Sequence, residues 1–369
     1  MAGVLSSRQI QTLIQQGMIG SQTPFTSGQI QPNTLDLRLG AVCYRVRSSF
    51  LTRTARVEDK INELLMYELD LRQGAILEKG CVYIIPLQEM MNLPEHIHGR
   101  TNPKSSTGRL DIFTRVISDY DYRFNYVAPG YHGKLYVEVS PMSFTIEVHS
   151  GDSLNQLRLV NEHSLRLDEN EIREYYKKFP LLYDDHGNAV PENNVDIGDD
   201  GLFLSIDLSQ SLHSGIVGYR SKKNSEVIDI RKVNHYPVHA FWEPISLKNG
   251  HIILEPEEFY IFASRERIAI PEDICGEMIA YDPDSGELRV HYAGFFDSGF
   301  GFSSQGKIGA KAVLEIRPHD VPFLIEHGQV LCRILFETND ESPVQLYGSG
   351  IQSHYQHQGL RLSKHFMQD

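Results

Sequence analysis

Residues 74–99 read GAILEKGCVYIIPLQEMMNLPEHIHG, and residues 250–276 read GHIILEPEEFYIFASRERIAIPEDICG. Both stretches begin and end on glycine and carry, in the same order, a glutamate, a Tyr-Ile pair and a Pro-Glu pair. From the glutamate onward these shared positions lie 177 residues apart, and the same offset joins Glu138 to Glu315. A repeat at a constant offset is typical of a duplicated unit. The chain of 369 residues is therefore expected to contain two copies of one domain.

The second copy is expected to begin near residue 200. The triplet Leu-Asp-Leu at 35–37 corresponds to Ile-Asp-Leu at 206–208, at an offset of 171 residues. The stretch between the copies is rich in charged and turn-forming residues, which is typical of a connector. We therefore predict a first copy over 1–160, a connector over 161–200 and a second copy over 201–369.

Both copies are predicted to be mainly β. Short apolar runs bounded by Gly, Pro, Asp and Asn are typical of strands; they occupy 76–77, 83–85, 135–137, 260–262 and 330–336. Their spacing favours a sandwich, a jelly roll or a distorted barrel in each copy. A few helices are also expected, over 6–17 with Ser7 as the cap, over 59–69, and over 169–178 in the connector.

The composition is that of a soluble globular protein, with 41% hydrophobic and 22% charged residues. No apolar run approaches the roughly 18 residues that would span a bilayer. The first residues lack the basic region and apolar stretch of a secretory signal. The four cysteines are scattered and form no CxxC pair, which suits a reducing compartment. A cytoplasmic protein with no membrane partner is expected.

The net charge is −13, from 48 acidic and 35 basic residues. Nucleic-acid binding is not expected, because that affinity comes mostly from lysine and arginine neutralising phosphates. A small anionic substrate is compatible with the charge, because one or two cations in a pocket outweigh a diffuse acidic surface.

The segment Lys-Ser-Ser-Thr-Gly-Arg at 104–109 is a candidate anion cradle, since hydroxyls and backbone amides orient phosphate oxygens while cations neutralise them. The alternative is an ordinary turn. In the second copy the corresponding positions carry Pro283, Asp284 and Glu287. A turn needed by the fold should survive in both copies, whereas a ligand site can be lost from one. The comparison favours the ligand site.

A second candidate site lies at 293–300 and on the strand that follows. Asp297 sits among glycines that let a ligand approach the backbone, and an aspartate there can accept a hydrogen bond from a sugar hydroxyl. Glu315 follows an apolar run and is expected to be at least partly buried, which suits a carboxylate for proton transfer. Glu138 occupies the equivalent place in the first copy. Phe295, Phe296 and Phe300 in this segment are candidates for a wall or for stacking against a ligand, although core packing is the commoner role of phenylalanine. For Glu315 the alternative is an exposed glutamate on a strand.

Taken together, these motifs resemble the dCTP deaminase family of the dUTPase-like superfamily. The resemblance rests on QPNTLDLRLG at 31–40, the cradle at 104–109, residues 293–299, Leu314-Glu315 and the tail over 347–359. It implies a distorted β-barrel or jelly-roll domain, present here twice. The implied reaction is hydrolytic deamination of dCTP to dUTP and ammonia, which supplies dUTP for thymidylate synthesis.

The resemblance also implies roles for individual residues. Ser105 and Arg109 would be catalytic, and Lys104 and Ser106 would bind phosphate. Glu315 would be the general base for a water that attacks C4 of cytosine. Further implied contacts are the Ala293 carbonyl on that water, Asp297 on the deoxyribose 3′-hydroxyl, and Tyr347, Tyr355 and Gln358 in a tail that closes over the nucleotide.

The implied cofactor is Mg²⁺ carried by the triphosphate, with no metal bound by the protein. The His-x-Glu and Pro-Cys-x-x-Cys pattern of zinc deaminases is absent from the sequence. The expected partners are dCTP, dTTP as a candidate inhibitor, and further copies of the chain in a homo-oligomer. Two positions depart from the family pattern, because Lys104 stands where arginine is common and His354 stands where lysine is common.

Neither copy carries the whole set of residues. We therefore expect a composite site, with the cradle from the first copy and Asp297 and Glu315 from the second. If first copies associate only with first copies, Glu138 would be the base beside Ser105. Other activities stay open: dUTP diphosphatase, a bifunctional path from dCTP to dUMP, or nucleotide binding without turnover.

Overall fold

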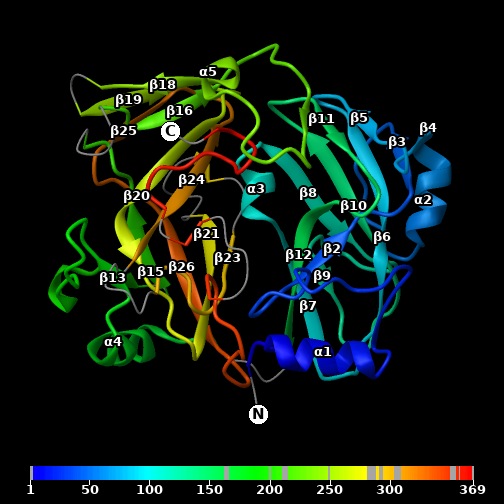
Figure 1. Ribbon diagram of the computed structural model, residues 1–369, viewed down its shortest axis with the longest axis horizontal. Coiled ribbons are helices and arrows are strands. Elements are labelled where there is room, and N and C mark those ends of the chain that lie inside the picture. Colours follow the sequence, from blue (N-terminus) through cyan, green and yellow to red (C-terminus); the bar gives the residue numbers. More distant parts are fainter. Residues whose placement is uncertain are drawn as a thin grey trace. The chain divides into compact units, whose positions relative to one another are not determined.

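A computed structural model of the protein divides the chain into two compact units (Figure 1). The first unit comprises Met1–Ser164, Lys223–Pro237 and Ser363–Asp369, and the second comprises Leu165–Lys222 and Val238–Leu362. The structure describes residues 3–161, 166–198, 201–209, 215–247, 250–280, 288–290, 294–302, 309–349, 355–356 and 358–367. In these residues no helix is long and apolar enough to cross a membrane. The predicted boundaries at 160 and 200 stay predictions.

The first unit is a β structure with three short helices. Its largest sheet has the order β4-β3-β6-β10-β8 with β1 beside β6, a second sheet has the order β2-β12-β7-β9, and a third the order β17-β11-β5. The helices are α1 (Ser7–Gln15), α2 (Val57–Leu64) and α3 (Ser105–Gly108). The strands are β1 (Ile19–Ser21), β2 (Leu35–Arg38), β3 (Val42–Val46), β4 (Leu65–Asp70), β5 (Ala75–Leu77), β6 (Val82–Asn92), β7 (Ile97–Pro103), β8 (Ile112–Ile117), β9 (Tyr126–Val127), β10 (His132–Pro141), β11 (Ile146–Val148), β12 (Ser153–Asn161) and β17 (Ile228–Asp229).

The second unit repeats this plan. Its sheets have the orders β18-β16-β20-β24-β22 with β13 beside β20, β14-β15-β26-β21-β23, and β19-β25. The helices are α4 (Glu169–Lys178), α5 (Val238–Phe241) and the 3₁₀ turn Glu192–Asn194. The strands are β13 (Leu182–Tyr183), β14 (Ile197–Gly198), β15 (Gly201–Ser205), β16 (Gly218–Ser221), β18 (Trp242–Ile245), β19 (His251–Leu254), β20 (Tyr260–Ile268), β21 (Ile274–Ala280), β22 (Leu288–Val290), β23 (Phe295–Phe296), β24 (Ala310–Pro318), β25 (Phe323–Glu326) and β26 (Val330–Thr338).

Strand pairing in the two units keeps the register that the sequence repeat predicts. On β10 of the first unit, Glu138 lies opposite Ile84 of β6. On β24 of the second unit, Glu315 lies opposite Ile261 of β20. Each residue of the second pair lies 177 positions after its counterpart in the first. A slip of one residue would turn every side chain to the other face of the sheet, so a shared register means a shared core. The predicted duplication of a mainly β domain is confirmed.

A turn between strands is also the same in both units. The backbone N–H of Glu78 donates to the Tyr83 hydroxyl at 3.0 Å, and that of Glu255 donates to the Tyr260 hydroxyl at 3.0 Å. Both tyrosine rings are buried. This bond satisfies the one polar atom of a ring that otherwise packs in the core.

The predicted first helix is confirmed, but its predicted cap is wrong. The helix starts at Ser7, and Ser6 is the cap: its hydroxyl accepts from the backbone N–H of Gln9, whose side chain accepts from the N–H of Ser6. This reciprocal pair needs a glutamine three residues after the capping serine, and only Ser6 has one.

The predicted helix over 59–69 is right only in its first part. Helix α2 ends at Leu64, and Leu65–Asp70 forms strand β4, in which Leu69 lies opposite Cys43 of β3. Pairing with β3 overrides the helical spacing of the apolar residues, as tertiary contacts often do. The predicted helix over 169–178 is confirmed as α4, with Asp168 as its cap.

Candidate active site

The predicted cradle forms one helical turn between β7 and β8 of the first unit. Lys104 is the N-terminal cap of α3 and Arg109 is the C-terminal cap. Ser105 is exposed, whereas Ser106 and Arg109 are buried. The Thr107 hydroxyl donates to the Leu154 carbonyl at 2.8 Å and ties the turn to β12. The structure therefore brings Lys104, Ser105, Ser106 and Arg109 together on one short element.

An aspartate that the sequence reasoning missed holds the lysine of this cradle. The Lys104 ammonium forms an ion pair with Asp36 Oδ2 on β2. The other carboxylate oxygen of Asp36 is buried and has no hydrogen-bond partner in the described residues. The pair fixes the direction of the lysine side chain. The available signal was the Leu-Asp-Leu triplet at 35–37, whose aspartate recurs in the Ile-Asp-Leu triplet of the second copy.

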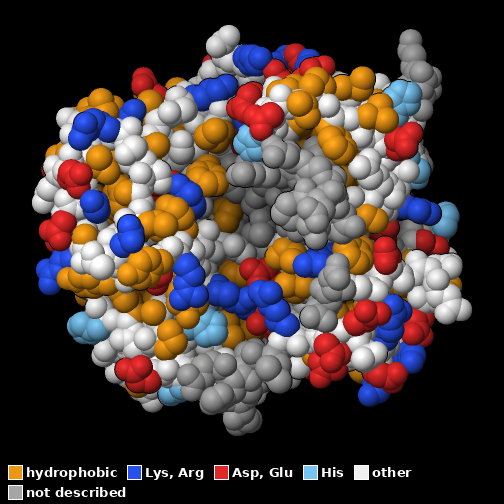
Figure 2. Space-filling model, turned by 180° about the vertical axis from the view of Figure 1, so that it is seen from behind, with side chains coloured by type: hydrophobic (Ala, Val, Ile, Leu, Met, Phe, Trp, Pro, Cys, Tyr) orange, Lys and Arg blue, Asp and Glu red, His pale blue; other side chains and the backbone are white. Residues whose placement is uncertain are grey.

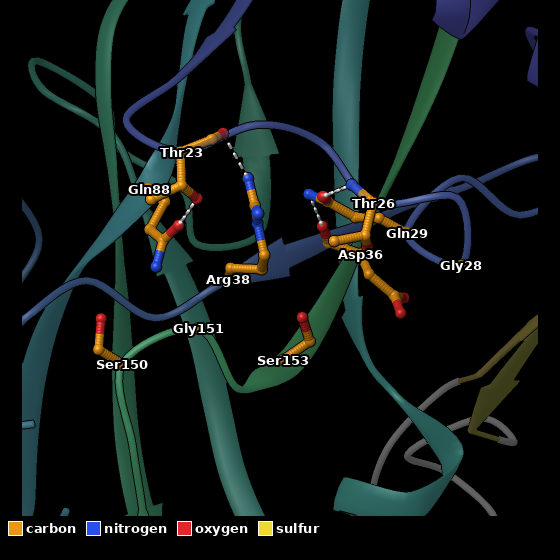
Figure 3. A pocket seen from close by; sticks show the side chains of 10 residues that line it. All are labelled: Thr23, Thr26, Gly28, Gln29, Asp36, Arg38, Gln88, Ser150, Gly151 and Ser153. Carbon is orange, nitrogen blue, oxygen red and sulfur yellow. Dashed lines mark hydrogen bonds between the residues drawn. The ribbon is translucent and has the colours of Figure 1, made fainter. Parts of the chain in front are cut away.

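The same aspartate lines a polar pocket of about 480 Å³ in the first unit. Figure 3 shows Arg38 in its centre, and the Asp36 carboxylate points away from that arginine. Arg38 is itself neutralised, because its Nε donates to Glu89 Oε1 at 2.8 Å and both side chains are buried. Lining residues are Thr23, Thr26, Gly28, Gln29, Asp36, Arg38, Gln88, Ser150, Gly151 and Ser153.

Glu138, the second candidate base, forms an ion pair with an arginine of the first unit. It is 1% exposed, and its Oε1 accepts from Arg115 Nη2 at 2.6 Å and from Nε at 3.1 Å. The Arg115 guanidinium lies over the ring of Phe124, 3.7 Å from its centre. The Glu138 carboxylate is therefore held in an ion pair within its own unit.

Glu315, the first candidate base, is buried on β24 of the second unit, where it is 5% exposed. Every residue of Ala310–Pro318 is buried, so the strand runs through the interior of its sheet. The predicted burial of Glu315 is confirmed. The side chain is held on a rigid element, which suits a group that must be positioned for proton transfer.

The segment that begins at Asp297 contacts Tyr347 through the two residues Ser298 and Phe300. Asp297 is 7% exposed and directly follows β23. The Tyr347 backbone N–H donates to the Ser298 carbonyl at 2.9 Å, and its ring lies 5.6 Å from that of Phe300. Gly299 has a φ of +94°. A Cβ at Gly299 would also lie 2.6 Å from Leu346 Cβ, so only glycine fits between the two segments.

The other predicted tail residues are packed against the second unit. Gln358 is 4% exposed, and its Nε2 donates to the Lys311 carbonyl at 2.8 Å. Tyr355 is buried, with the Arg361 guanidinium 5.8 Å from the centre of its ring. Ala293, Pro283, Asp284, Glu287 and His354 lie outside the described residues.

Charge on the surface is mixed. Figure 2 shows one face on which the Lys and Arg side chains of the described residues are interspersed with Asp and Glu. In the described part of the chain, no three His, Cys, Asp or Glu side chains are grouped closely enough to hold a metal ion.

Comparison with known proteins shows the family of this chain. Residues 1–163 match the model of the 2′-deoxycytidine 5′-triphosphate deaminase N-terminal domain, and residues 168–366 match that of the C-terminal domain. The crystal structure of 2′-deoxycytidine 5′-triphosphate deaminase from Agrobacterium tumefaciens is similar with a TM-score of 0.86 and 43% identity, over 92% of this chain and 99% of that one.

Shorter relatives match less than half of the chain. The protein named "dCTP deaminase, dUMP-forming" from Parafrankia sp. is 31% identical over 161 residues, which are 42% of this chain and 75% of the relative. Its namesake from Corynebacterium glutamicum is 28% identical over 165 residues, 44% of this chain and 82% of the relative. Together with the two family matches, these similarities show that the chain belongs to the 2′-deoxycytidine 5′-triphosphate deaminase family.

Proposed function

We propose that the protein catalyses the hydrolytic deamination of dCTP to dUTP and ammonia. The observation that carries this proposal is the 43% identity to the Agrobacterium tumefaciens dCTP deaminase over almost the whole chain. The cradle supports it from the residues upward, because Lys104, Ser106 and Arg109 offer two cations and a hydroxyl to a polyphosphate.

Catalysis combines residues from both copies. Glu315 takes a proton from a water molecule as the water oxygen bonds to C4 of the cytosine ring, and passes it to the amino group, which leaves as ammonia when the C4–N bond breaks. The second proton of the water ends on N3 as the C4 carbonyl forms. Ser105 and the Ala293 carbonyl position the water, and Arg109 stabilises the charge that develops. Glu315 is preferred to Glu138 as the base because it belongs to the same copy as Asp297, the proposed ligand of the 3′-hydroxyl.

The substrate is bound by the other residues of the cradle in the first copy and of the Asp297 segment and the tail in the second copy. Lys104 and Ser106 bind the triphosphate, Asp297 accepts a hydrogen bond from the 3′-hydroxyl, and Tyr347, Tyr355 and Gln358 belong to a segment that closes over the nucleotide. Mg²⁺ enters as part of the substrate. The enzyme acts as a homo-oligomer, and dTTP is its inhibitor.

The test is to supply Mg²⁺ and dCTP to the purified protein and to measure ammonia and nucleotide products. Equal amounts of ammonia and dUTP are expected. Titrating Mg²⁺ at a fixed dCTP concentration should raise the rate until the metal matches the nucleotide, not the protein. A protein that binds dCTP but releases no ammonia would overturn the proposal.

A second candidate reaction is the conversion of dCTP to dUMP. The observation that favours it is that the shorter relatives are named as dUMP-forming. This reaction also releases pyrophosphate, which the first does not. Accumulation of dUMP and pyrophosphate in proportion to ammonia would replace the first proposal by the second.

A further inference from the structure

Residues 363–367, the last that the structure describes, belong to the first unit and form a segment that we call the clasp. The N–H of Asn234 donates to the Lys364 carbonyl at 2.8 Å, and the N–H of Met367 donates to the Tyr236 carbonyl at 2.8 Å. Phe366 is fully buried, and its ring centre lies 6.4 Å from that of Phe144. Burial of a whole phenylalanine side chain stabilises the folded state, because its apolar surface is removed from water. The clasp is therefore firmly anchored.

The clasp touches the cradle directly. The hydroxyl of Ser363, which is fully buried, donates to the backbone carbonyl of Ser106 at 2.9 Å. The ring of His365 joins this bond to the loop 223–237, with Nδ1 2.9 Å from Ser363 Oγ and Nε2 2.8 Å from the Ile230 carbonyl. The His365 ring therefore ties Ser363, and with it the cradle, to the loop 223–237.

Lys364 stands between the two anchored residues of the clasp, one position after the serine that bonds to the cradle. It is half-buried. Burial, followed by the positive charge of Lys104, lowers the pKa of Lys364, against the opposing effect of Asp36 and Asp152. Lys104 and Lys364 both feel the negative charge of Asp36, and their own positive charges repel each other. An anion that binds between them would remove this repulsion.

We propose that Lys364 is a third cationic ligand of the cradle, held there by the clasp to bind the phosphate chain of the substrate. The proposal rests on the proposed function in taking that anion to be the triphosphate of dCTP. The clasp gives the cradle a cation that the sequence places 260 residues after Lys104. Because Ser363 and His365 are buried and hydrogen-bonded, the lysine between them is pre-positioned, which reduces the entropy lost on binding.

The experiment compares Lys364→Met with the wild type. Inorganic tripolyphosphate is the binding probe, titrated calorimetrically, and dCTP deamination gives KM and kcat. Loss of one charge-assisted contact should weaken tripolyphosphate binding and raise the KM for dCTP by about tenfold, with kcat within about twofold. The slope of log Kd against log salt should fall, because one fewer ion pair is screened.

Three further variants act as controls. Lys364→Arg should keep tripolyphosphate affinity within about threefold, because the charge remains. Lys232→Met removes the same charge from a half-exposed lysine whose Nζ is 4.0 Å from Asp229, and it should leave binding unchanged. Lys364→Gln gives a second neutral variant with a polar tip, to be used if the methionine variant melts below the wild type.

The proposal is wrong if a folded Lys364→Met or Lys364→Gln variant binds tripolyphosphate as tightly as the wild type. It is also wrong if Lys232→Met loses as much affinity as Lys364→Met. The outcome is separable from that of the proposed function. If the wild type releases no ammonia from dCTP while Lys364→Met still loses tripolyphosphate binding tenfold, Lys364 is an anion ligand and the proposed function is wrong.

Discussion

The two copies hold the same aspartate against a lysine, but in different surroundings. In the first unit, Asp36 is paired with Lys104, whose side chain is 25% exposed and belongs to the cradle. In the second unit, Asp207 takes the same place in the repeat and is paired with Lys311 on β24, 2.7 Å away and fully buried. In the first unit the aspartate therefore holds a lysine that solvent reaches. In the second unit both the aspartate and its lysine are buried.

The equivalent glutamates are buried in both units, with Glu138 1% and Glu315 5% exposed. In the first unit Glu138 forms an ion pair with Arg115. The cradle occurs only in the first copy. The predictions below compare residues of the two units.

The largest effect is expected from the two glutamates. Glu315→Gln should lower kcat for dCTP deamination by about 10³-fold, because the amide cannot take a proton from water. Glu138→Gln should keep activity within about tenfold, because it removes only an ion pair with Arg115. Ammonia release measures both. An active Glu315→Gln beside an inactive Glu138→Gln would exchange the roles of the two residues.

The next effect concerns stability. Lys311→Met should lower the free energy of unfolding by about 3 kcal/mol, because it leaves the buried charge of Asp207 without its partner. Lys104→Met should cost less than Lys311→Met, because the Lys104 side chain is 25% exposed whereas that of Lys311 is fully buried. Chemical denaturation of both variants measures the difference. The double variant with Asp207→Asn should recover part of the loss, and equal costs in the two units would contradict the contrast drawn here.

The sequence reasoning reached the features that depend on local pattern or on the repeat. The strands, the shared register and the burial of Glu315 follow from apolar spacing and the offset of 177 residues. It missed β4, because the sequence at 65–70 suits a helix and only pairing with β3 makes it a strand.

It also missed the ion pair of Asp36 with Lys104 and the clasp. Each of these depends on residues that meet only after the chain has folded back: Asp36 and Lys104 are 68 residues apart, and Ser363 and Ser106 are 257 apart. A periodic pattern within a short stretch of sequence carries no information about contacts between residues so far apart in the chain. The repeated triplet marked Asp36 as important, but not its partner.

A smaller effect is expected from acid. Burial acts to raise the pKa of Asp207, but hydrogen bonds from Lys311 and Ser209 and the charge of Lys311 outweigh it and hold this pKa below 3.8. The unfolded state then binds a proton more readily than the folded one. The resulting stability is present above pH 3.8 and is lost as the pH falls through the folded pKa.

Asp207→Asn should therefore flatten the acid limb of the stability curve, measured by urea denaturation between neutral and strongly acidic pH. Asp152 in the first unit gives the opposite case, because burial raises its pKa, so the folded state binds its proton more readily and its contribution is lost as the pH rises. Asp152→Asn should leave the acid limb at least as steep as in the wild type. An acid limb that Asp207→Asn does not change would contradict the assignment.

The smallest effects are expected at the helix caps, where the two units are alike. Ser6 caps α1 and Asp168 caps α4, each in a reciprocal pair with the side chain three residues on. Ser6→Ala and Asp168→Ala should each cost about 1 kcal/mol of unfolding free energy. Asp168 also carries a negative charge at the start of its helix, so its loss should be the larger by a few tenths of a kcal/mol at low salt, and the difference should vanish as salt is added. Thermal melting at two salt concentrations separates the charge from the hydrogen bond, since the hydrogen bond persists at high salt.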